Sequence, residues 1–306
     1  MADRYFLLGP TASGKTAVAL ELAGLLNAEI LSLDSMLVYQ GMDIGTAKPS
    51  AEEMAAVPHH LIDLVPASED FSVAKYLQAA AAAEAEVHAR GKKALYVGGT
   101  TMWFKALVFG LLEIPDASPE LEQELETELE QNGSTALRTE LESVDPAAAK
   151  RIHPNDTRRL LRAIGVWRTT GKSMSDWQEQ WGQRATIDEP AALLEWPREV
   201  LHQRVANRFQ TMVEDGLLEE VQAILESGGF SRSAGKAIGY WQVIDYMEGR
   251  CTLEVALQRA VTKTNVLIRR QMTWLRSFPD LQRIEMQASE PASVVAARLA
   301  AAWCTK

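Results

Sequence analysis

Residues 9–16 read Gly9-Pro-Thr-Ala-Ser-Gly14-Lys15-Thr16, a complete G-x-x-x-x-G-K-T pattern. The pattern follows a β-rich run at Arg4–Leu8 and opens a helical pattern at Lys15–Leu26, the context in which such a loop binds phosphates. Its glycines let the backbone N–H groups turn toward an anion, and the helix N-terminus adds a positive end. The residues that we expect to bind a diphosphate are Gly9, Thr11, Ala12, Ser13, Gly14, Lys15 and Thr16, with the Thr16 hydroxyl as a ligand of Mg²⁺.

The first hundred residues alternate β-rich runs with helical patterns, which is typical of a parallel sheet with crossover helices. The expected strands are Arg4–Leu8, Glu29–Leu33, His60–Val65 and Lys93–Val97. A second expected helix, Ser72–Arg90, ends before Gly91, a residue that adopts the left-handed conformation at little cost. This order predicts an α/β fold with a P-loop NTPase-like parallel sheet core.

From about residue 115 the pattern becomes helical only. The expected helices are Pro119–Gln131, Ser134–Val144, one opening at 145–146 and one running from 155 or 156 to 168. Farther on, we expect a returning strand at Ala191–Trp196 and helices from Pro197, over Thr252–Phe278 and over Glu290–Trp303. We therefore predict a catalytic core domain formed by residues 1–114 and 187–306, with an all-helical insertion domain at 115–186.

Composition places the chain among ordinary globular proteins. Its 47% hydrophobic and 24% charged residues exclude disordered and fibrous classes. No apolar run approaches the roughly 20 residues needed to cross a bilayer. Cys251 and Cys304 are too few and too far apart for a disulfide framework or a four-ligand zinc site. We expect a cytoplasmic monomer with no membrane partner.

Charge is distributed unevenly along the chain. Residues 113–145 hold eleven acidic residues against the single base Arg138, so this segment alone accounts for the net charge of −10. Two basic stretches lie in the neutral remainder, residues 150–172 and residues 259–276. Either stretch could follow a phosphate backbone or form an ordinary solvated helix face, and charge alone favours the second interpretation.

Asp34 follows directly after the second expected strand. Open α/β sheets gather their reactive groups at the carboxyl ends of parallel strands, so we expect a functional role for this carboxylate. It could bind Mg²⁺ or accept a proton.

The segment Asp34-Ser-Met-Leu-Val-Tyr-Gln-Gly-Met-Asp-Ile-Gly-Thr-Ala-Lys-Pro49, together with residues 9–16, closely resembles the tRNA dimethylallyltransferases, also called tRNA isopentenyltransferases. The resemblance covers nearly the whole chain. Further matching segments follow in the expected order: Pro58-His-His-Leu-Ile-Asp63, Val97-Gly-Gly-Thr100, His153-Pro-Asn-Asp156, Arg158-Arg-Leu-Leu-Arg162, residues 198–209, Gly239-Tyr240 and Arg270-Gln-Met-Thr-Trp274.

This resemblance implies transfer of a dimethylallyl group from dimethylallyl diphosphate to the exocyclic amine of the adenosine 3′ to the anticodon, with release of pyrophosphate. The P-loop would then hold a leaving group. The resemblance implies catalytic roles for Asp34 as general base, Thr100 as a substrate contact and Arg208 as a diphosphate ligand. It also implies tRNA contacts at Asp34, Ser35, Met36, Leu37, Thr100, Arg158, Arg159, Leu160, Leu161, Arg162, Lys236, Ala237, Ile238, Gly239, Tyr240 and Trp241.

Physical reasoning is compatible with these implied roles. Arg204 and Arg208 are four residues apart and share a helix face, where they either hold the diphosphate or pair with Glu199 or Asp215. The adenosine must leave the anticodon stack to react, and Trp103 and Tyr240 could line its route or pack in the core. With the resemblance, tRNA contact becomes the favoured interpretation of residues 150–172.

Three positions depart from the pattern of the family: Trp103 in the expected wall of the prenyl pocket, and Asn265 and Lys236 where arginines are usual. Lysine cannot reproduce a bidentate guanidinium contact. Two other interpretations stay open. A small P-loop kinase would share the loop, the sheet and a helical lid, and a nucleotide-dependent binding module would bind nucleotide without forming a product.

Overall fold

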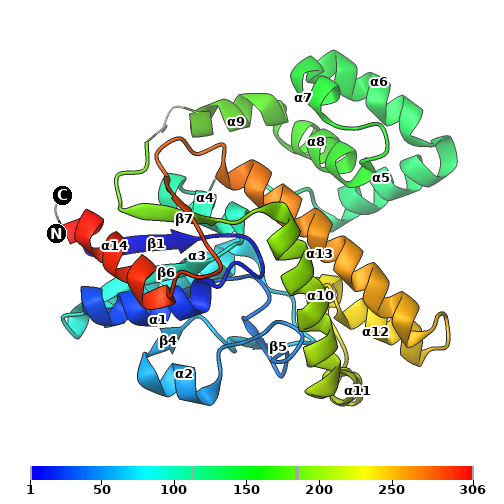
Figure 1. Cartoon of the computed structure of the whole chain (residues 1–306). Coiled ribbons are helices and arrows are strands. Elements are labelled where there is room, and N and C mark those ends of the chain that lie inside the picture. The colour runs from blue at the N-terminus through cyan, green and yellow to red at the C-terminus, as the bar shows by residue number, and fades with distance from the viewer. Residues whose placement is uncertain (1, 112–113, 183–185, 305–306) are drawn as a thin grey trace. The chain divides into compact units, whose positions relative to one another are not determined.

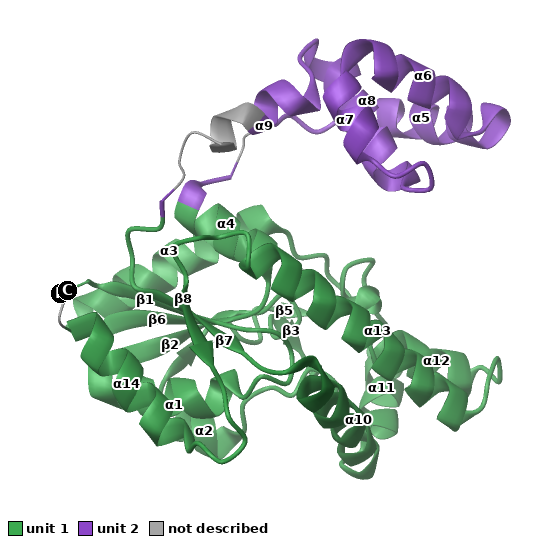
Figure 2. Ribbon diagram, turned by 45° about the horizontal axis from the view of Figure 1, so that its top comes forward, with its two compact units in different colours: residues 1–108, 187–306 green, residues 109–186 purple. Residues whose placement is uncertain are grey.

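The computed structural model describes residues 2–111, 114–182 and 186–304. The chain forms two compact units, one from residues 1–108 and 187–306 and the other from residues 109–186 (Figure 2). The structure thus divides the chain after residues 108 and 186, whereas the predicted domain boundaries follow residues 114 and 186.

A six-stranded parallel sheet forms the centre of the first unit (Figure 1). Its strand order is β4-β2-β6-β1-β7-β8. Its strands are β1 (Arg4–Leu8), β2 (Ala28–Leu33), β4 (His59–His60), β6 (Lys93–Gly98), β7 (Ala191–Glu195) and β8 (Gln282–Glu285). Because all pairs are parallel, the loops that follow β1, β2 and β6 emerge at one edge of the sheet. The predicted α/β class with a P-loop-like core is confirmed.

Alternate residues of the central strands face opposite layers of helices, as the two-residue period of a strand requires. Tyr5 and Leu7 of β1 pack with α1 (Lys15–Leu26) and α14 (Ala292–Cys304), which lie side by side on one face (Figure 1). On the other face, Phe6 stacks on Tyr96 at 5.3 Å, and its ring meets the edge of Phe104 in α4 (Thr101–Phe109) at 5.1 Å.

The remaining helical elements of this unit lie around the sheet (Figure 1). They are α2 (Ala51–Ala56), α3 (Val73–Ala89), α10 (Arg198–Glu214), α11 (Leu217–Glu226), a 3₁₀ turn at Ala234–Lys236, α12 (Tyr240–Met247) and α13 (Leu253–Leu275). The predicted strand His60–Val65 is wrong as one element. Leu61 and Asp63 take left-handed φ values of 64° and 56°, which interrupt the extended chain. Only β4 joins the main sheet, while β5 (Val65–Pro66) pairs with β3 (Tyr39–Gln40).

The second unit is all helical: α5 (Pro119–Asn132), α6 (Ser134–Val144), α7 (Pro146–Arg151), α8 (Thr157–Thr170) and α9 (Met174–Gly182). Apolar residues of α5 to α8 form its own core, with Leu125, Leu141 and Leu160 all nearly inaccessible. Arg168 of α8 ties the helices together by bonding Glu128 at 3.0 Å and also Glu140. Across the described residues, no helix is both long and apolar enough to cross a membrane.

Candidate functional site

The loop between β1 and α1 has the conformation that its glycines and small residues permit. Ala12 and Gly14 take left-handed φ values of 64° and 78°, and Gly14 immediately precedes α1. Two side chains hold the loop from outside: Trp196 donates a hydrogen bond to the Ser13 carbonyl at 2.9 Å, and Arg204 donates to the Ala12 carbonyl at 3.4 Å. These contacts hold the loop in a conformation that can cradle an anion.

Lys15 places its ammonium group inside this cradle, where Nζ donates to the Pro10 carbonyl at 2.8 Å. Loss of hydration on burial lowers its pKa to about 8, opposed by the negative charge of Asp34 and reinforced by the positive charge of Arg208. Because this ammonium group has few water molecules around it, an anion that enters the cradle can interact with it strongly.

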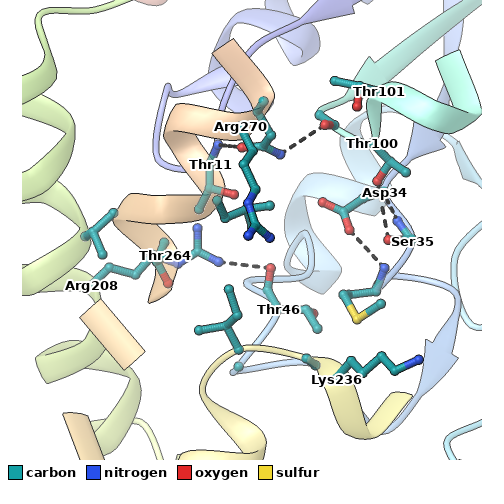
Figure 3. A pocket seen from close by; sticks show the side chains of 18 of the residues that line it. Thr11, Asp34, Ser35, Thr46, Thr100, Thr101, Arg208, Lys236, Thr264 and Arg270 are labelled. Carbon is teal, nitrogen blue, oxygen red and sulfur yellow. Dashed lines mark hydrogen bonds between the residues drawn. The ribbon is translucent and has the colours of Figure 1, made fainter. Parts of the chain in front are cut away.

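Asp34, Ser35 and Thr100 meet where β2 and β6 end. The Asp34 carboxylate accepts a hydrogen bond from the Met36 N–H at 2.9 Å, and the Thr100 hydroxyl accepts one from the Ser35 N–H at 3.0 Å. Gly98 allows this close approach, since a Cβ there would lie 2.0 Å from the Leu33 carbonyl oxygen. In Figure 3 the Asp34 carboxylate lies beside Thr100 and Ser35, facing the interior of a pocket.

Arg208 reaches the site from α10. Its guanidinium donates to the Thr46 carbonyl at 3.0 Å, and burial lowers its pKa from the ordinary value while Asp34 opposes that shift. Among the described residues, neither Arg208 nor Arg204 pairs with Glu199 or Asp215. Arg204 instead lies 3.8 Å above the ring of Trp196. The helix ion pair is thus replaced by contacts with the P-loop and the Thr46 loop.

Two cavities adjoin at these residues. One, of about 380 Å³, is lined by the P-loop from Thr11 to Thr16. The other, of about 400 Å³, is lined by Ser35, Thr100, Arg270 and Trp274 among others (Figure 3). Thr11, Asp34, Thr46 and Arg208 line both. We call the first the P-loop cavity and the second the acceptor cavity. A ligand bound in one can therefore meet a ligand bound in the other at Asp34 and Arg208.

The P-loop cavity also suits the Mg²⁺ ion implied by the family resemblance. The Thr16 hydroxyl and the Asp34 carboxylate both line it, and the buried Ser32 hydroxyl there has no hydrogen-bond partner among the described residues. The described chain holds no cluster of three or more acidic, His or Cys side chains that would form a protein cage for a metal. This donor set fits Mg²⁺, which is commonly held by one or two protein oxygens, substrate phosphates and water.

Most of the predicted site residues are brought together in the first unit. Those lining the acceptor cavity are Thr11, Asp34, Ser35, Met36, Thr100, Arg208, Lys236, Ala237 and Ile238. Leu37 lines the P-loop cavity instead, and Gly9 lies behind it, where its N–H bonds the Gly98 carbonyl at 3.2 Å. Gly239 and Trp241 line neither cavity.

Three side chains considered for contact with tRNA are core residues. Tyr240 is fully buried and bonds Glu220, and Trp103 stacks on Tyr76 at 3.9 Å, so both pack in the interior and do not line a route for the base. Leu160 is buried in the core of the second unit. Leu160 lies in α8 and Tyr240 begins α12, and each occupies the face of its helix that packs in the core.

Arg158, Arg159, Leu161 and Arg162 remain at least partly accessible on α8. Arg159 lies near Asp156 at 3.4 Å and Arg162 bonds Asp116 at 2.6 Å, both exposed pairs of the kind that contribute little to stability. These side chains are available to a polyanion.

Sequence reasoning missed Gln271. Its amide oxygen accepts from the Thr11 N–H at 3.1 Å, and its amide nitrogen donates to the Gly99 carbonyl at 3.0 Å. One side chain of α13 thus joins the P-loop to the end of β6. The signal was present in the segment Arg270-Gln-Met-Thr-Trp274, but nothing local indicates a contact across 260 residues of sequence.

The lowered pKa of Lys15 predicts a pH dependence. The Lys15 amine must be protonated to attract a diphosphate, and its pKa in the free protein is about 8, so its contribution to affinity should be constant well below pH 8 and be lost as the pH rises through this value. Calorimetric titration with inorganic pyrophosphate from pH 6 to 10 measures this. Lys15→Met is the control for titration of the ligand itself: its affinity should lack the fall assigned to Lys15, and an identical profile in both proteins would contradict the assignment.

Comparison with known proteins gives consistent results. The family model described as IPP transferase matches residues 37–278. A protein of Thioalkalivibrio sulfidiphilus named tRNA dimethylallyltransferase is 43% identical over 296 residues, covering 95% of this chain and 92% of that one. A Methylococcus capsulatus protein of the same name is 45% identical over 283 residues, covering 91% of each. A crystal structure described as a eukaryotic dimethylallyltransferase acting on tRNA superposes with a TM-score of 0.76 at 25% identity, covering 93% of this chain and 74% of that one.

Proposed function

The chain belongs to the IPP transferase family, and on that basis we propose that it transfers a dimethylallyl group from dimethylallyl diphosphate to the exocyclic amine of the adenosine 3′ to the anticodon of tRNA. The observation that carries the proposal is the meeting of a diphosphate cradle and a second cavity at Asp34 and Arg208. A two-substrate transfer needs this arrangement, because donor and acceptor must meet while each stays bound.

The P-loop cavity suits the diphosphate of the donor. In the reaction the bond between the prenyl carbon and its oxygen breaks, and negative charge collects on the departing pyrophosphate. Backbone N–H groups of the loop, Lys15 and Arg208 supply positive potential where that charge develops, the task that usually contributes most to such catalysis. When bound at Thr16, Mg²⁺ would add positive charge beside the same oxygens.

The acceptor cavity suits the extruded base. Its walls combine Met36, Met212 and Trp274 with hydroxyl groups such as that of Thr100, a mixture that accommodates an apolar ring with a polar edge. The amine nitrogen forms the new bond to the prenyl carbon, and its proton passes to Asp34, whose carboxylate faces the cavity (Figure 3). Thr100 holds the Ser35 backbone and thereby the turn that carries Asp34.

Mass analysis of nucleosides tests the function. Unmodified tRNA is incubated with the protein and dimethylallyl diphosphate, digested, and compared with tRNA treated with heat-inactivated protein. We expect one adenosine per tRNA to gain the mass of a dimethylallyl group in place of hydrogen, and mass analysis of nuclease-derived oligonucleotides to locate it 3′ to the anticodon. Turnover of ATP without this product would favour a kinase instead.

The exposed arginines of α8 should bind the phosphate backbone of tRNA. Replacing Arg158, Arg159 and Arg162 with Ala should weaken tRNA binding and flatten its salt dependence, by about 0.7 in the log–log slope for each phosphate that the variant no longer neutralises. Filter binding across a salt series measures the slope.

A matched control removes the same charge elsewhere: Lys92, Arg283 and Arg298, which are all exposed in the first unit and line neither cavity, are replaced together with Ala. Arg168 is kept in both variants because it holds α5, α6 and α8 together. Equal slopes in the two triple variants would assign the α8 arginines to a solvated helix face.

A further inference from the structure

Arg208 depends on one short loop for its placement. Among the described residues, its hydrogen bond to the Thr46 carbonyl at 3.0 Å is the one hydrogen bond that its guanidinium makes (Figure 3). An arginine side chain is long and has many rotamers, so a single bond restrains it only as well as the acceptor itself is held. What fixes the Thr46 carbonyl therefore also fixes the guanidinium.

The loop before Thr46 is held by Glu220 of α11. The Glu220 carboxylate accepts three consecutive backbone N–H groups, from Asp43 at 2.9 Å, Ile44 at 2.7 Å and Gly45 at 3.1 Å. Successive N–H groups that converge on one anion form a nest, which ordinarily binds a phosphate or a bound ion. Here the protein supplies the anion from its own chain.

Tyr240 completes this arrangement. Its hydroxyl donates to the same carboxylate at 2.6 Å, so Glu220 accepts four hydrogen bonds in all. The Tyr240 ring is fully buried and lies directly against Gly45, where a Cβ would come within 2.4 Å of it. Burial, followed by the charge of Glu220, raises the pKa of Tyr240, which keeps the hydroxyl a donor.

We propose that Glu220 is a positioning residue for Arg208: it locks the loop of residues 43–46, and the locked loop holds the guanidinium at the junction of the two cavities. Glu220 lines neither cavity, so it acts through the loop and not by contact with substrate. This proposal rests on the proposed function in one respect, namely that Arg208 binds a diphosphate.

A double-mutant cycle on pyrophosphate binding tests this. In Glu220→Gln, one carboxylate oxygen becomes an NH₂ group, which cannot accept the hydrogen bonds that the oxygen accepted. The loop of residues 43–46 should therefore loosen, and the dissociation constant of inorganic pyrophosphate should rise about tenfold. Arg208→Ala should weaken binding at least as much. In the Arg208→Ala background, Glu220→Gln should then cost less than twofold, because the group that it positions is gone.

A matched control separates positioning from general stability. Glu29 in β2 is another carboxylate with several donors, since it accepts from Arg90 at 3.1 and 2.7 Å and pairs with His60 at 2.6 Å, and it lines neither cavity. Glu29→Gln should lower the melting temperature and leave pyrophosphate affinity within twofold of the parent. If Glu220→Gln does not fold, Tyr240→Phe removes one donor from the carboxylate and should show the same non-additivity with Arg208→Ala.

Additive effects of Glu220→Gln and Arg208→Ala would overturn the proposal, as would a parent protein that binds no pyrophosphate. The cycle requires no tRNA and no product. A non-additive cycle in a protein that forms no dimethylallyl adenosine would therefore refute the proposed function and leave the positioning role standing.

Discussion

Asp34→Asn should reduce turnover by about 10² to 10⁴, the usual contribution of a positioned general base, while pyrophosphate and tRNA affinity stay nearly unchanged. The exocyclic amine of adenine is a weak nucleophile because its lone pair is delocalised into the ring, so loss of its proton during attack matters. Asparagine keeps the size of Asp34 and an acceptor for the Met36 N–H, which bonds the carboxylate at 2.9 Å, but it cannot take up the proton. Single-turnover kinetics with saturating tRNA and donor measure the effect.

A different role for Asp34 predicts a different outcome. As a Mg²⁺ ligand in the P-loop cavity, its loss would weaken the diphosphate complex, and added Mg²⁺ would partly restore the rate. The same single-turnover assay across a Mg²⁺ titration separates the roles, and recovery of the rate at high Mg²⁺ would sink the general-base assignment.

Lys15→Ala should lower the rate of transfer by about 10² to 10³, the effect of removing one preorganised donor from a developing anion. The ammonium contacts the Pro10 carbonyl within the loop and lies in the cavity that we assign to the leaving group. Its removal leaves the sheet intact, so the melting temperature should change little. Lys92→Ala, at an exposed lysine that lines neither cavity, is the control. A steady-state rate for Lys15→Ala within twofold of the parent would contradict the cradle assignment.

The sequence was most informative where function depends on adjacent residues. The P-loop and Asp34 each follow a buried strand directly, and parallel strands bring their carboxyl ends to one edge, so their meeting could be predicted from the strand pattern. Thr100, two residues after β6, was predicted only from the resemblance to the family. The polar strand β8 (Gln282–Glu285) was missed because a short edge strand with alternating exposed charges resembles a loop in sequence.

Interactions between distant parts of the chain could not be predicted. Gln271 bonds Thr11 across 260 residues, and Glu220 bonds Gly45 across 175 residues, so no local pattern marks either side chain. Tyr240 shows the converse limit. Its sequence left open whether it lines the route of the base or packs in the core, and tertiary packing against Gly45 and Phe230 buries it completely. Burial of an aromatic residue depends on its neighbours in space and not on its own segment.

In the mechanism proposed above, the P-loop holds a leaving group whose departure is coupled to attack by tRNA. A single reaction with dimethylallyl diphosphate, in which released pyrophosphate and dimethylallyl adenosine in tRNA are counted together, tests that coupling. We predict one pyrophosphate for each modified adenosine and none when tRNA is omitted. Pyrophosphate released without modified tRNA, or modification that requires hydrolysis of ATP, would refute the mechanism.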